Sequence, residues 1–175
     1  MLDTARKLFL EHGFDATSLQ HIADTMGVTK ANVYYYFKTK IAILEALLAP
    51  TVEALTQRLD AAERITDHAE RVDYLITTWV EQVVIAYRTL APMSRADPIV
   101  RRHEQISRDL TELSERGLRL MFGPEPTLDE QAAYWLISDL GVVNRRLTHL
   151  SDDDLRATLV RLCRRVVADL APRPR

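Results

Sequence analysis

Residues 17–40 read TSLQHIADTMGVTKANVYYYFKTK and are the most informative stretch of the chain. Their pattern predicts two short helices joined at Gly27, since glycine readily takes the left-handed backbone conformation that a tight turn between helices needs. Thr17, followed three residues later by Gln20, has the spacing of a capping box and is expected to cap the first helix. The stretch therefore predicts a helix, a tight turn and a second helix.

Apolar residues recur at helical spacing in both helices, so each has one face suited to a core. In the first helix these residues are Leu19, Ile22, Ala23 and Met26. Thr29 is expected to cap the second helix, which runs through Phe37 and turns Val33 inward. The pattern predicts a helix-turn-helix over residues 18–37, in which the second helix presents its N-terminal residues to the DNA major groove.

Several positions resemble the DNA-binding domain of the TetR family of transcriptional regulators. The matching residues are Ala5-x-x-Leu8-Phe9-x-x-x-Gly13-Phe14, Thr17, Ile22-Ala23, Gly27-Val28-Thr29 and Val33-Tyr34-x-Tyr36-Phe37-x-x-Lys40. They follow one another in fixed order without an insertion, so the whole unit resembles the family. TetR regulators usually have several residues, often basic, before their first helix, whereas this sequence begins at Met1-Leu2, already inside that helix, so such an arm is either absent or lies outside this sequence.

The resemblance implies that the second helix and its flanks contact DNA. Base edges are expected to meet Lys30, Ala31, Asn32 and Tyr35, since lysine pairs with guanine acceptors and asparagine with adenine. Phosphates are expected to meet Thr17, Tyr34 and Lys40. The full set of expected DNA-binding residues is Thr17, Ser18, Thr29, Lys30, Ala31, Asn32, Tyr34, Tyr35, Lys38 and Lys40.

The charge distribution agrees with DNA binding only locally. The chain has a net charge of −2, so it is no general polyanion binder. Residues 25–44, however, contain three lysines and no acidic residue. This small basic face suits phosphate contacts. The alternative is a solvated charged face whose tyrosines lie half in the core.

Composition predicts an all-α protein. The 175 residues are 47% hydrophobic and include only five glycines, and runs of alternating polarity are missing. We expect an N-terminal helix-turn-helix domain over residues 1–48 and a helical effector-binding and dimerisation domain over residues 49–175. No apolar stretch approaches the roughly 20 residues of a membrane span, and no secretory signal is present. A single cysteine, Cys163, excludes an internal disulfide and fits the reducing cytoplasm.

Capping and breaking residues predict about nine helices in all. Pro50 lies inside an apolar helical pattern that Thr39 can open, and is expected to kink or break that helix. The other expected boundaries are an N-cap at Asp67, a short helix from Asp97-Pro98 to about Arg102, a stop at Gly123-Pro124, a capping box of Thr127 with Glu130 opening a helix to about Leu147, and an N-cap at Ser151.

The last two expected helices carry more apolar surface than one packing partner requires. The TetR resemblance implies a homodimer through these helices. The residues expected at the dimer interface are Leu136, Leu140, Val143, Leu155, Leu159, Leu162 and Val166. The alternative is that these apolar stripes serve the core of a single subunit.

The resemblance also implies that the middle helices bind a small-molecule effector. Bulky apolar side chains with a few polar groups suit such a pocket. The residues expected to line it are Trp79, Tyr87, Met93, His103, Met121 and Trp135. Each of them could equally belong to an ordinary core.

Catalytic and metal-binding patterns are missing from the sequence. The five histidines are scattered, and no phosphate-binding glycine loop or nucleophile elbow is present. We therefore expect no catalytic residues, no metal and no cofactor, and interpret the chain as a non-enzyme. The leading hypothesis is a dimeric, ligand-responsive regulator of transcription, a repressor, that binds double-stranded operator DNA in the cytoplasm. The alternative is a dimeric helical DNA-binding protein without an effector; a helical enzyme with an attached helix-turn-helix is a distant third.

Overall fold

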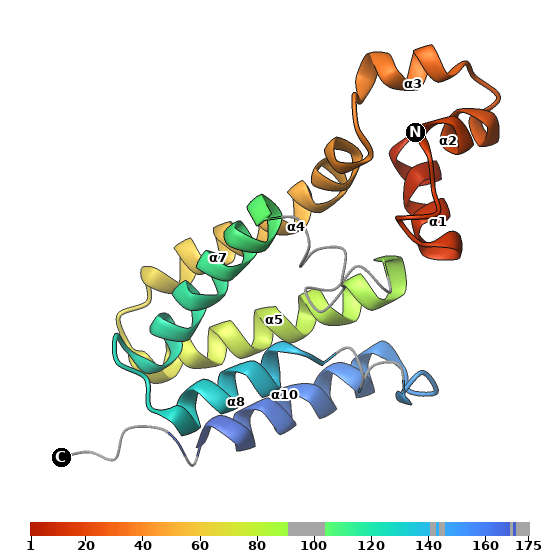
Figure 1. Cartoon of the computed structure of the whole chain (residues 1–175). Coiled ribbons are helices and arrows are strands. Elements are labelled where there is room, and N and C mark those ends of the chain that lie inside the picture. The colour runs from red at the N-terminus through yellow and green to blue at the C-terminus, as the bar shows by residue number, and fades with distance from the viewer. Residues whose placement is uncertain (91–103, 141–142, 144–145, 169, 171–175) are drawn as a thin grey trace. The chain divides into compact units, whose positions relative to one another are not determined.

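The computed structural model describes residues 1–90, 104–140, 143, 146–168 and 170, and within this part every regular element is a helix (Figure 1). The helices are α1 (Leu2–His12), α2 (Leu19–Met26), α3 (Lys30–Tyr36), α4 (Lys40–Glu63), α5 (His68–Leu90), α7 (Glu104–Phe122), α8 (Leu128–Ser138) and α10 (Asp152–Ala168). The predicted all-α class is confirmed. The described residues form eight helices where the sequence predicted about nine, and the expected helix at 97–102 lies outside them.

The chain divides into two compact units, Met1–Ala54 and Leu55–Arg175. Helix α4 runs through the boundary, so its first part belongs to the N-terminal unit and its last turns to the second. Pro50 lies inside this helix, which nevertheless continues to Glu63 without a break. Of the two expected effects of Pro50, a kink or a break, the break is therefore not observed. A proline removes one hydrogen bond of the helical ladder, and the remaining bonds continue the helix past it.

The core of the N-terminal unit is built from small and medium apolar residues of its four helices. The Phe9 and Phe14 rings pack at 5.0 Å between centroids and close the end of α1. The buried residues are Ala5, Leu8, Phe9, Phe14, Ile22, Ala23, Val33, Ile43, Leu44 and Leu48. Because α3 contributes only Val33 to this list, nearly its whole surface is left facing outward.

The turn between α2 and α3 has the geometry that the sequence predicted. Gly27 adopts the left-handed conformation, with φ of 68° and ψ of 29°. The Thr29 hydroxyl accepts a hydrogen bond from the Asn32 backbone N–H at 3.3 Å, which confirms the cap of α3. The cap of α2 was assigned to the wrong residue: Ser18, and not Thr17, accepts the bond from the His21 N–H at 3.0 Å.

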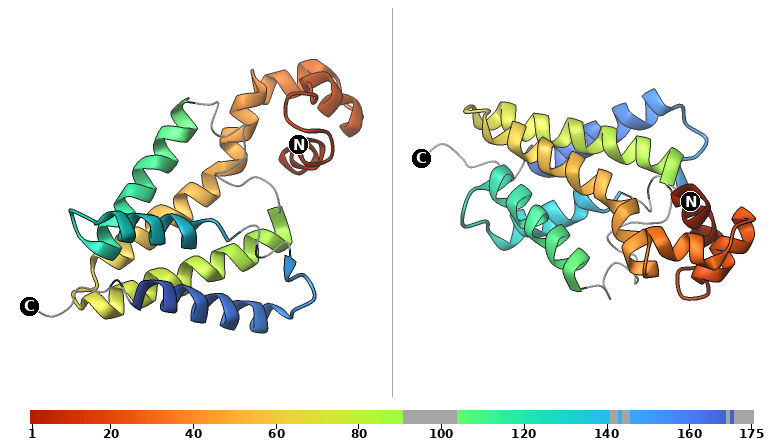
Figure 2. Two further views of the ribbon diagram at one scale, coloured as in Figure 1. Left: turned by 60° about the horizontal axis from the view of Figure 1, so that its bottom comes forward. Right: turned by 90° about the horizontal axis from the view of Figure 1, so that it is seen from above.

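The core of the second unit forms where α5 and α10 lie side by side, as Figures 1 and 2 show. Four residues of α10 spaced four apart make one continuous buried ridge: Leu155, Leu159, Cys163 and Val167. The facing residues of the other helices are Leu59, Ala62, Leu75, Ile76, Val80, Val84, Met121 and Ile137. Residues four apart share one helix face, so the buried residues of α10 lie along a single ridge, and Val160 and Val166 pack beside it.

Most of the expected helix ends in this unit are confirmed. The Asp67 carboxylate accepts the Glu70 N–H at 2.7 Å and caps α5. Gly123 follows α7 with a φ of 97°, and Thr127 with Glu130 forms a complete capping box before α8. The Ser151 hydroxyl accepts the Asp154 N–H at 3.1 Å and caps α10.

The length predicted for α8 was wrong. The expected helix extended to about Leu147, but α8 ends at Ser138, and Asp139 leaves the helical region with φ of −118° and ψ of 73°. The Ser138 hydroxyl donates to the Tyr134 carbonyl at 2.7 Å. Serine and aspartate offer the backbone such local alternatives to the helical ladder, which makes them weak helix formers. The apolar periodicity continues past this point, and for that reason the sequence did not reveal the stop.

Candidate functional site

Helix α3 presents the side chains that the sequence assigned to DNA. Lys30, Ala31 and Asn32 are exposed in its first turn, while Val33 is fully buried and anchors the helix to the core. The tyrosines that follow are exposed too: Tyr34 by 49%, Tyr35 by 76% and Tyr36 by 64%. Tyr35 and Tyr36 thus lie mostly in solvent, whereas about half of the Tyr34 surface is covered, as the alternative expected.

Two exposed hydroxyls cap the helices of the helix-turn-helix, Ser18 at the start of α2 and Thr29 at the start of α3. Ser18 and Thr29 are exposed, and each accepts a backbone N–H from the helix that it caps. Each hydroxyl therefore keeps its own proton available for an outside acceptor. Helix N-termini and hydroxyl groups are common phosphate contacts in protein–DNA complexes.

Thr17 has a different role from the one expected. It is 1% exposed, and its hydroxyl lies 2.8 Å from the Gly13 carbonyl and 3.3 Å from the Leu8 carbonyl, with Oγ1 as the donor. Gly13 follows the last residue of α1, so its carbonyl has no partner within that helix, and Leu8 lies in the second-last turn of α1. Thr17 thus ties α1 to the start of the helix-turn-helix, and its buried hydroxyl is not available to a phosphate.

The lysines after α3 are held in two different ways. Lys38 is exposed, with its Nζ 4.5 Å from the centroid of the Tyr34 ring. Lys40 is only partly exposed, and its Nζ donates to the carbonyls of Phe14 at 2.7 Å and Asp15 at 3.2 Å. Two of the three Lys40 donors are therefore used inside the domain, so its expected role as mainly a phosphate contact needs correction: it also fastens α4 to the loop after α1.

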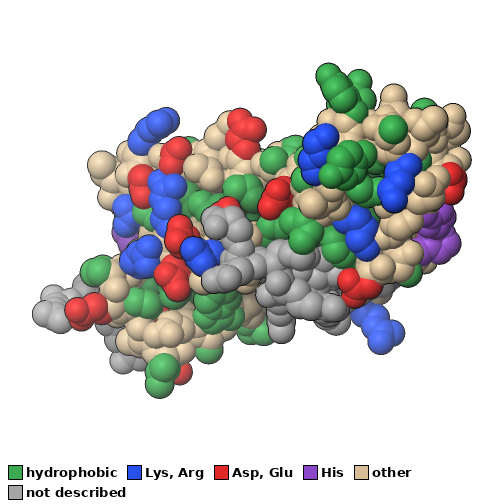
Figure 3. Space-filling view, turned by 45° about the horizontal axis from the view of Figure 1, so that its top comes forward, with side chains coloured by type: hydrophobic (Ala, Val, Ile, Leu, Met, Phe, Trp, Pro, Cys, Tyr) green, Lys and Arg blue, Asp and Glu red, His purple; other side chains and the backbone are tan. Residues whose placement is uncertain are grey.

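Basic and aromatic residues occur together in α3 and the segment after it. Figure 3 shows blue lysine and arginine side chains beside green hydrophobic ones, a colour that includes tyrosine. Between Thr25 and Leu44 the chain has Lys30, Lys38 and Lys40 and no acidic residue. Lysine ammonium groups attract phosphates, and aromatic edges add contact area. This face has the chemistry of a nucleic-acid surface.

The residues expected at a dimer interface divide into two sets. Leu140, Leu155 and Leu159 are at most 4% exposed within one chain, and Val143 and Val166 pack against the same core. Placing these three leucines at a dimer interface was wrong, because Leu155 and Leu159 lie on the buried ridge of α10 and Leu140, which follows α8, is buried in the same core. Leu136 and Leu162 are exposed by 66% and 44%.

Two residues that the sequence did not assign to the interface share this outward position. Leu128 at the start of α8 is 81% exposed, and Trp135, which was assigned to the ligand pocket, is 41% exposed. A contiguous exposed apolar surface commonly marks a protein contact. A leucine on the surface and a leucine in the core look the same in the sequence. Only the orientation of the helices shows which leucines are exposed.

Among the expected pocket residues that the structure describes, Trp79 and Met121 belong to one core and Trp135 is partly exposed. The Trp79 indole N–H donates to the Ile137 carbonyl at 2.9 Å inside the core, Met121 is buried, and Trp135 faces outward. Met93 and His103 lie outside the described residues, as does the side chain of Tyr87. The exposed position of Trp135 contradicts its assignment to a pocket.

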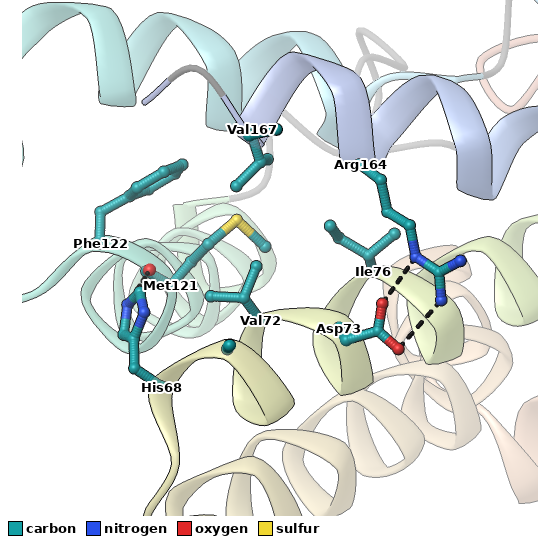
Figure 4. Close-up of a pocket in the computed structure, with 10 residues that line it drawn as sticks. His68, Val72, Asp73, Ile76, Met121, Phe122, Arg164 and Val167 are labelled. Carbon is teal, nitrogen blue, oxygen red and sulfur yellow. Dashed lines mark hydrogen bonds and ion pairs between the residues drawn. The ribbon is translucent and has the colours of Figure 1, made fainter. Parts of the chain in front are cut away.

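A small apolar hollow lies between α5, α7 and α10, shown in Figure 4. Its volume is about 180 Å³, and Val72, Ile76 and Met121 supply much of its lining. The Arg164–Asp73 ion pair, with bonds of 2.6 and 3.0 Å, closes one side. Pockets for drug-sized ligands measure roughly 300–1,000 Å³, so this hollow suits only a small molecule. The sequence had marked Met121 alone among its lining residues.

In the described part of the chain, no group of three or more His, Cys, Asp or Glu side chains is arranged to hold a metal ion. Cys163 is buried, and burial raises the pKa of its thiol to about 11. A thiol held in that state is a poor nucleophile at neutral pH. None of the helices described here is long and apolar enough to cross a membrane.

Comparison with known proteins identifies the N-terminal domain. Residues 1–47 match the bacterial regulatory proteins of the tetR family. The TetC protein of transposon Tn10 from Escherichia coli is 23% identical over 100 residues, which are 57% of this chain and 51% of TetC. The regulator IcaR of the biofilm operon icaADBC from Staphylococcus aureus is 42% identical over 45 residues, which are 26% of this chain and 24% of IcaR.

The chain thus spans about half the length of TetC and about a quarter of that of IcaR. Similarity of fold extends further. A transcriptional regulator of the TetR/AcrR family from Thermobifida fusca is 26% identical, covers 93% of both chains and has a TM-score of 0.56. Residues 1–47 therefore form a DNA-binding domain of the tetR family, and the chain shares its fold with the TetR/AcrR-family regulator from Thermobifida fusca over most of its length.

Proposed function

We propose that this protein is a transcriptional regulator that binds double-stranded operator DNA through α3. The observation that carries the proposal is the outward face of α3, where Lys30, Asn32 and Tyr35 are exposed beside the buried anchor Val33. In helix-turn-helix proteins this second helix enters the major groove with its N-terminal residues toward the bases.

The exposed residues divide by chemistry into two kinds of contact. Lys30 and Asn32 carry groups that pair with guanine and adenine edges, and Ala31 and Tyr35 stand beside them. Ser18, Thr29, Tyr34 and Lys38 surround the helix and suit phosphates, which fix the register of a protein on the duplex. Base preference would then come from the first turn of α3, and most of the affinity from its surroundings.

We propose a homodimer that forms through the outward faces of α8 and α10. Leu128, Trp135, Leu136 and Leu162 supply exposed apolar surface there. A two-fold axis makes one surface meet its own copy, so two copies of α3 would read a near-palindromic site whose half-sites are about 34–36 Å apart or somewhat wider.

The regulator is proposed to act in the cytoplasm as a repressor that a small molecule releases from DNA. IcaR, which resembles the N-terminal domain, is named a negative transcriptional regulator. The second candidate is a dimeric DNA-binding protein without an effector, and the small size of the hollow beside Met121 favours it. A ligand shifts DNA affinity only if it binds one of two conformations better.

Selection of bound sequences from a random double-stranded DNA library tests the proposal. We expect enrichment of a near-palindromic site, bound by the full chain with an affinity that falls as salt rises. Fluorescence anisotropy on the selected site then compares the wild type with Asn32→Ala. Failure to enrich any sequence, together with salt-independent binding, would reject the proposed function.

A further inference from the structure

Arg58 is an interior cation without an acidic partner in the described residues. It lies on α4 within the second unit, and its Nη1 is buried without a hydrogen-bond partner. The other terminal nitrogen, Nη2, donates to the Gln82 Oε1 over a long 3.4 Å. The side chain as a whole keeps partial exposure.

Other arginines of this unit are compensated. Arg116 bonds the carboxylates of Asp60 and Glu63, both at 2.7 Å. Arg71 donates to the carbonyls of Leu120 and Ile65, and Arg164 pairs with the Asp73 carboxylate. Arg58 differs from these three arginines in having a buried guanidinium nitrogen without a hydrogen-bond partner.

Acidic residues are close to Arg58 in the sequence but already engaged. Asp60 and Glu63 lie on the same helix as Arg58, and both pair with Arg116 of α7. Arg58 instead faces α5, as its bond to Gln82 shows. The nearest acids on α4 are thus held by another cation on another side of the helix.

The α5 residues near Arg58 add donors and few acceptors. Tyr74, Thr78 and Gln82 are spaced four apart and share one face of α5. Thr78 uses its hydroxyl to donate to the Tyr74 carbonyl at 2.7 Å. Within the described residues, neither the Tyr74 hydroxyl nor the Gln82 amide nitrogen donates a hydrogen bond, whereas the Gln82 oxygen already accepts from Arg58.

The physical cost of this arrangement points to a missing partner. Burial lowers the pKa of Arg58 from its ordinary value, and the nearby Tyr74 opposes that effect. A guanidinium stays protonated in proteins, so it remains a charge that the interior does not neutralise. Buried charges are normally paired because an uncompensated one destabilises the folded state.

We propose that Arg58 binds the carboxylate of a small-molecule effector, with the Tyr74 hydroxyl and the Gln82 amide as further donors. A carboxylate has the planar two-oxygen shape that accepts two parallel bonds from a guanidinium. This inference rests on the effector-responsive function proposed above and adds the chemical class of the effector.

The body of the ligand is expected to be apolar. Leu55 and Ala62 lie on the same face of α4 as Arg58, at three and four residues from it, and both contribute to the apolar core. An anionic head beside such side chains suits a carboxylate with a hydrocarbon tail or ring. A strongly polar sugar or a cation would leave these groups unmatched.

Calorimetric titration with octanoate, using 1-octanol as the uncharged probe of equal chain length, tests the assignment on the full chain without DNA. We expect octanoate to bind the wild type with a Kd of about 1 mM or tighter and to bind Arg58→Met at least about tenfold more weakly, a loss that one charge-assisted bond explains. Octanol should bind both proteins alike. Arg58→Lys should recover part of the octanoate affinity, because it restores the charge without the fork.

Arg119→Met is the matched control, since it removes one exposed positive charge from α7 of the same unit. Thermal unfolding of the ligand-free proteins is a second readout: Arg58→Met should melt about 2–4 °C higher than the wild type, because it removes an unpaired buried charge. A lower melting temperature for Arg58→Met would show that Arg58 already has a favourable partner and would overturn the proposal.

Two further outcomes would also overturn it: equal octanoate affinity in the wild type and Arg58→Met, or no octanoate binding up to about 10 mM, which corresponds to less than about 3 kcal/mol of binding free energy. Anisotropy on the selected DNA site is measured separately. Lost octanoate binding with intact DNA binding rejects only the carboxylate assignment, whereas lost DNA binding rejects the proposed function.

Discussion

Gly117 of α7 lies directly against the Tyr134 hydroxyl of α8, because glycine has no Cβ to occupy that space. A Cβ placed at position 117 would overlap the Tyr134 oxygen and come within 3.6 Å of the Leu59 side chain. Gly117 is inside a helix, where glycine is otherwise unfavourable relative to alanine. The residue therefore serves close packing between α7 and α8.

Gly117→Ala should lower the free energy of unfolding by about 1–2 kcal/mol, since the added methyl group must displace the Tyr134 side chain. In the Tyr134→Phe background the same substitution should be neutral or stabilising by up to about 1 kcal/mol, because only the helix propensity of alanine remains. Urea unfolding of the four proteins measures this coupling. Equal effects of Gly117→Ala in both backgrounds would show that the contact with the Tyr134 hydroxyl does not determine the stability of the variant.

Thr17→Val should destabilise the N-terminal unit by about 1–2 kcal/mol, since it leaves the Leu8 and Gly13 carbonyls without their buried donor. Any effect on DNA affinity should disappear under conditions where the variant is fully folded. Circular dichroism during urea unfolding, followed by anisotropy at low urea, checks both statements. If folded Thr17→Val protein bound all DNA sequences more weakly, Thr17 would have to be counted among the DNA-contacting residues.

Lys30→Ala and Lys38→Ala should affect DNA binding differently. Lys30→Ala is expected to cost about 1–3 kcal/mol and to relax preference at one base pair. Lys38→Ala should weaken all sequences alike and reduce the slope of log affinity against log salt by about one. Anisotropy at several salt concentrations on the selected site and its single-base variants measures both. Identical profiles for the two variants would contradict this division of roles.

Leu136→Glu combined with Leu162→Glu should give folded monomers with little operator affinity, because both side chains are exposed in one chain and charges there oppose an apolar contact. Leu159→Glu should instead unfold the second unit, since that side chain is fully buried. Sedimentation and circular dichroism distinguish the two results. A persistent dimer of the double variant would place the interface elsewhere.

Cys163 should make the stability of the protein decline at high pH. Burial raises the pKa of its thiol from 9.0 to about 11, so the folded state holds the proton more tightly than the unfolded state. This contribution is complete below pH 9 and is lost as the pH rises through 11. Urea unfolding between these limits, with Cys163→Ala as the reference, measures it. A rapid reaction of the native Cys163 thiol with a disulfide reagent at neutral pH would contradict a buried thiol with a raised pKa.

Local chemistry made the helix-turn-helix readable from the sequence. Gly27 and Thr29 act through backbone geometry and a hydroxyl within three residues, so no distant part of the chain is needed to find them. The same holds for the caps at Asp67 and Ser151. Thr17 shows the limit: two neighbouring hydroxyl residues fit the same cap, and only the position of α1 decides that Ser18 caps the helix while Thr17 is buried.

The apolar pattern of α8 and α10 was readable as helical but not as inward or outward. Leu159 and Leu162 are chemically identical, and a three-residue step separates a buried position from an exposed one. The sequence pattern also did not reveal that α8 ends at Ser138 or that a guanidinium nitrogen of Arg58 has no hydrogen-bond partner. A hydrogen bond to a carbonyl one turn earlier, or a missing carboxylate on a facing helix, leaves no mark on a single-sequence pattern.

The sequence by itself determined the helical class, the turn at Gly27 and the caps around it, because propensity, capping and glycine geometry act over a few residues. Only the tertiary structure decided which leucines of α10 are buried, that Thr17 fastens α1, and that Arg58 lies beside Tyr74 and Gln82. Those features depend on how helices distant in the sequence are rotated against one another, and side-chain packing sets that rotation.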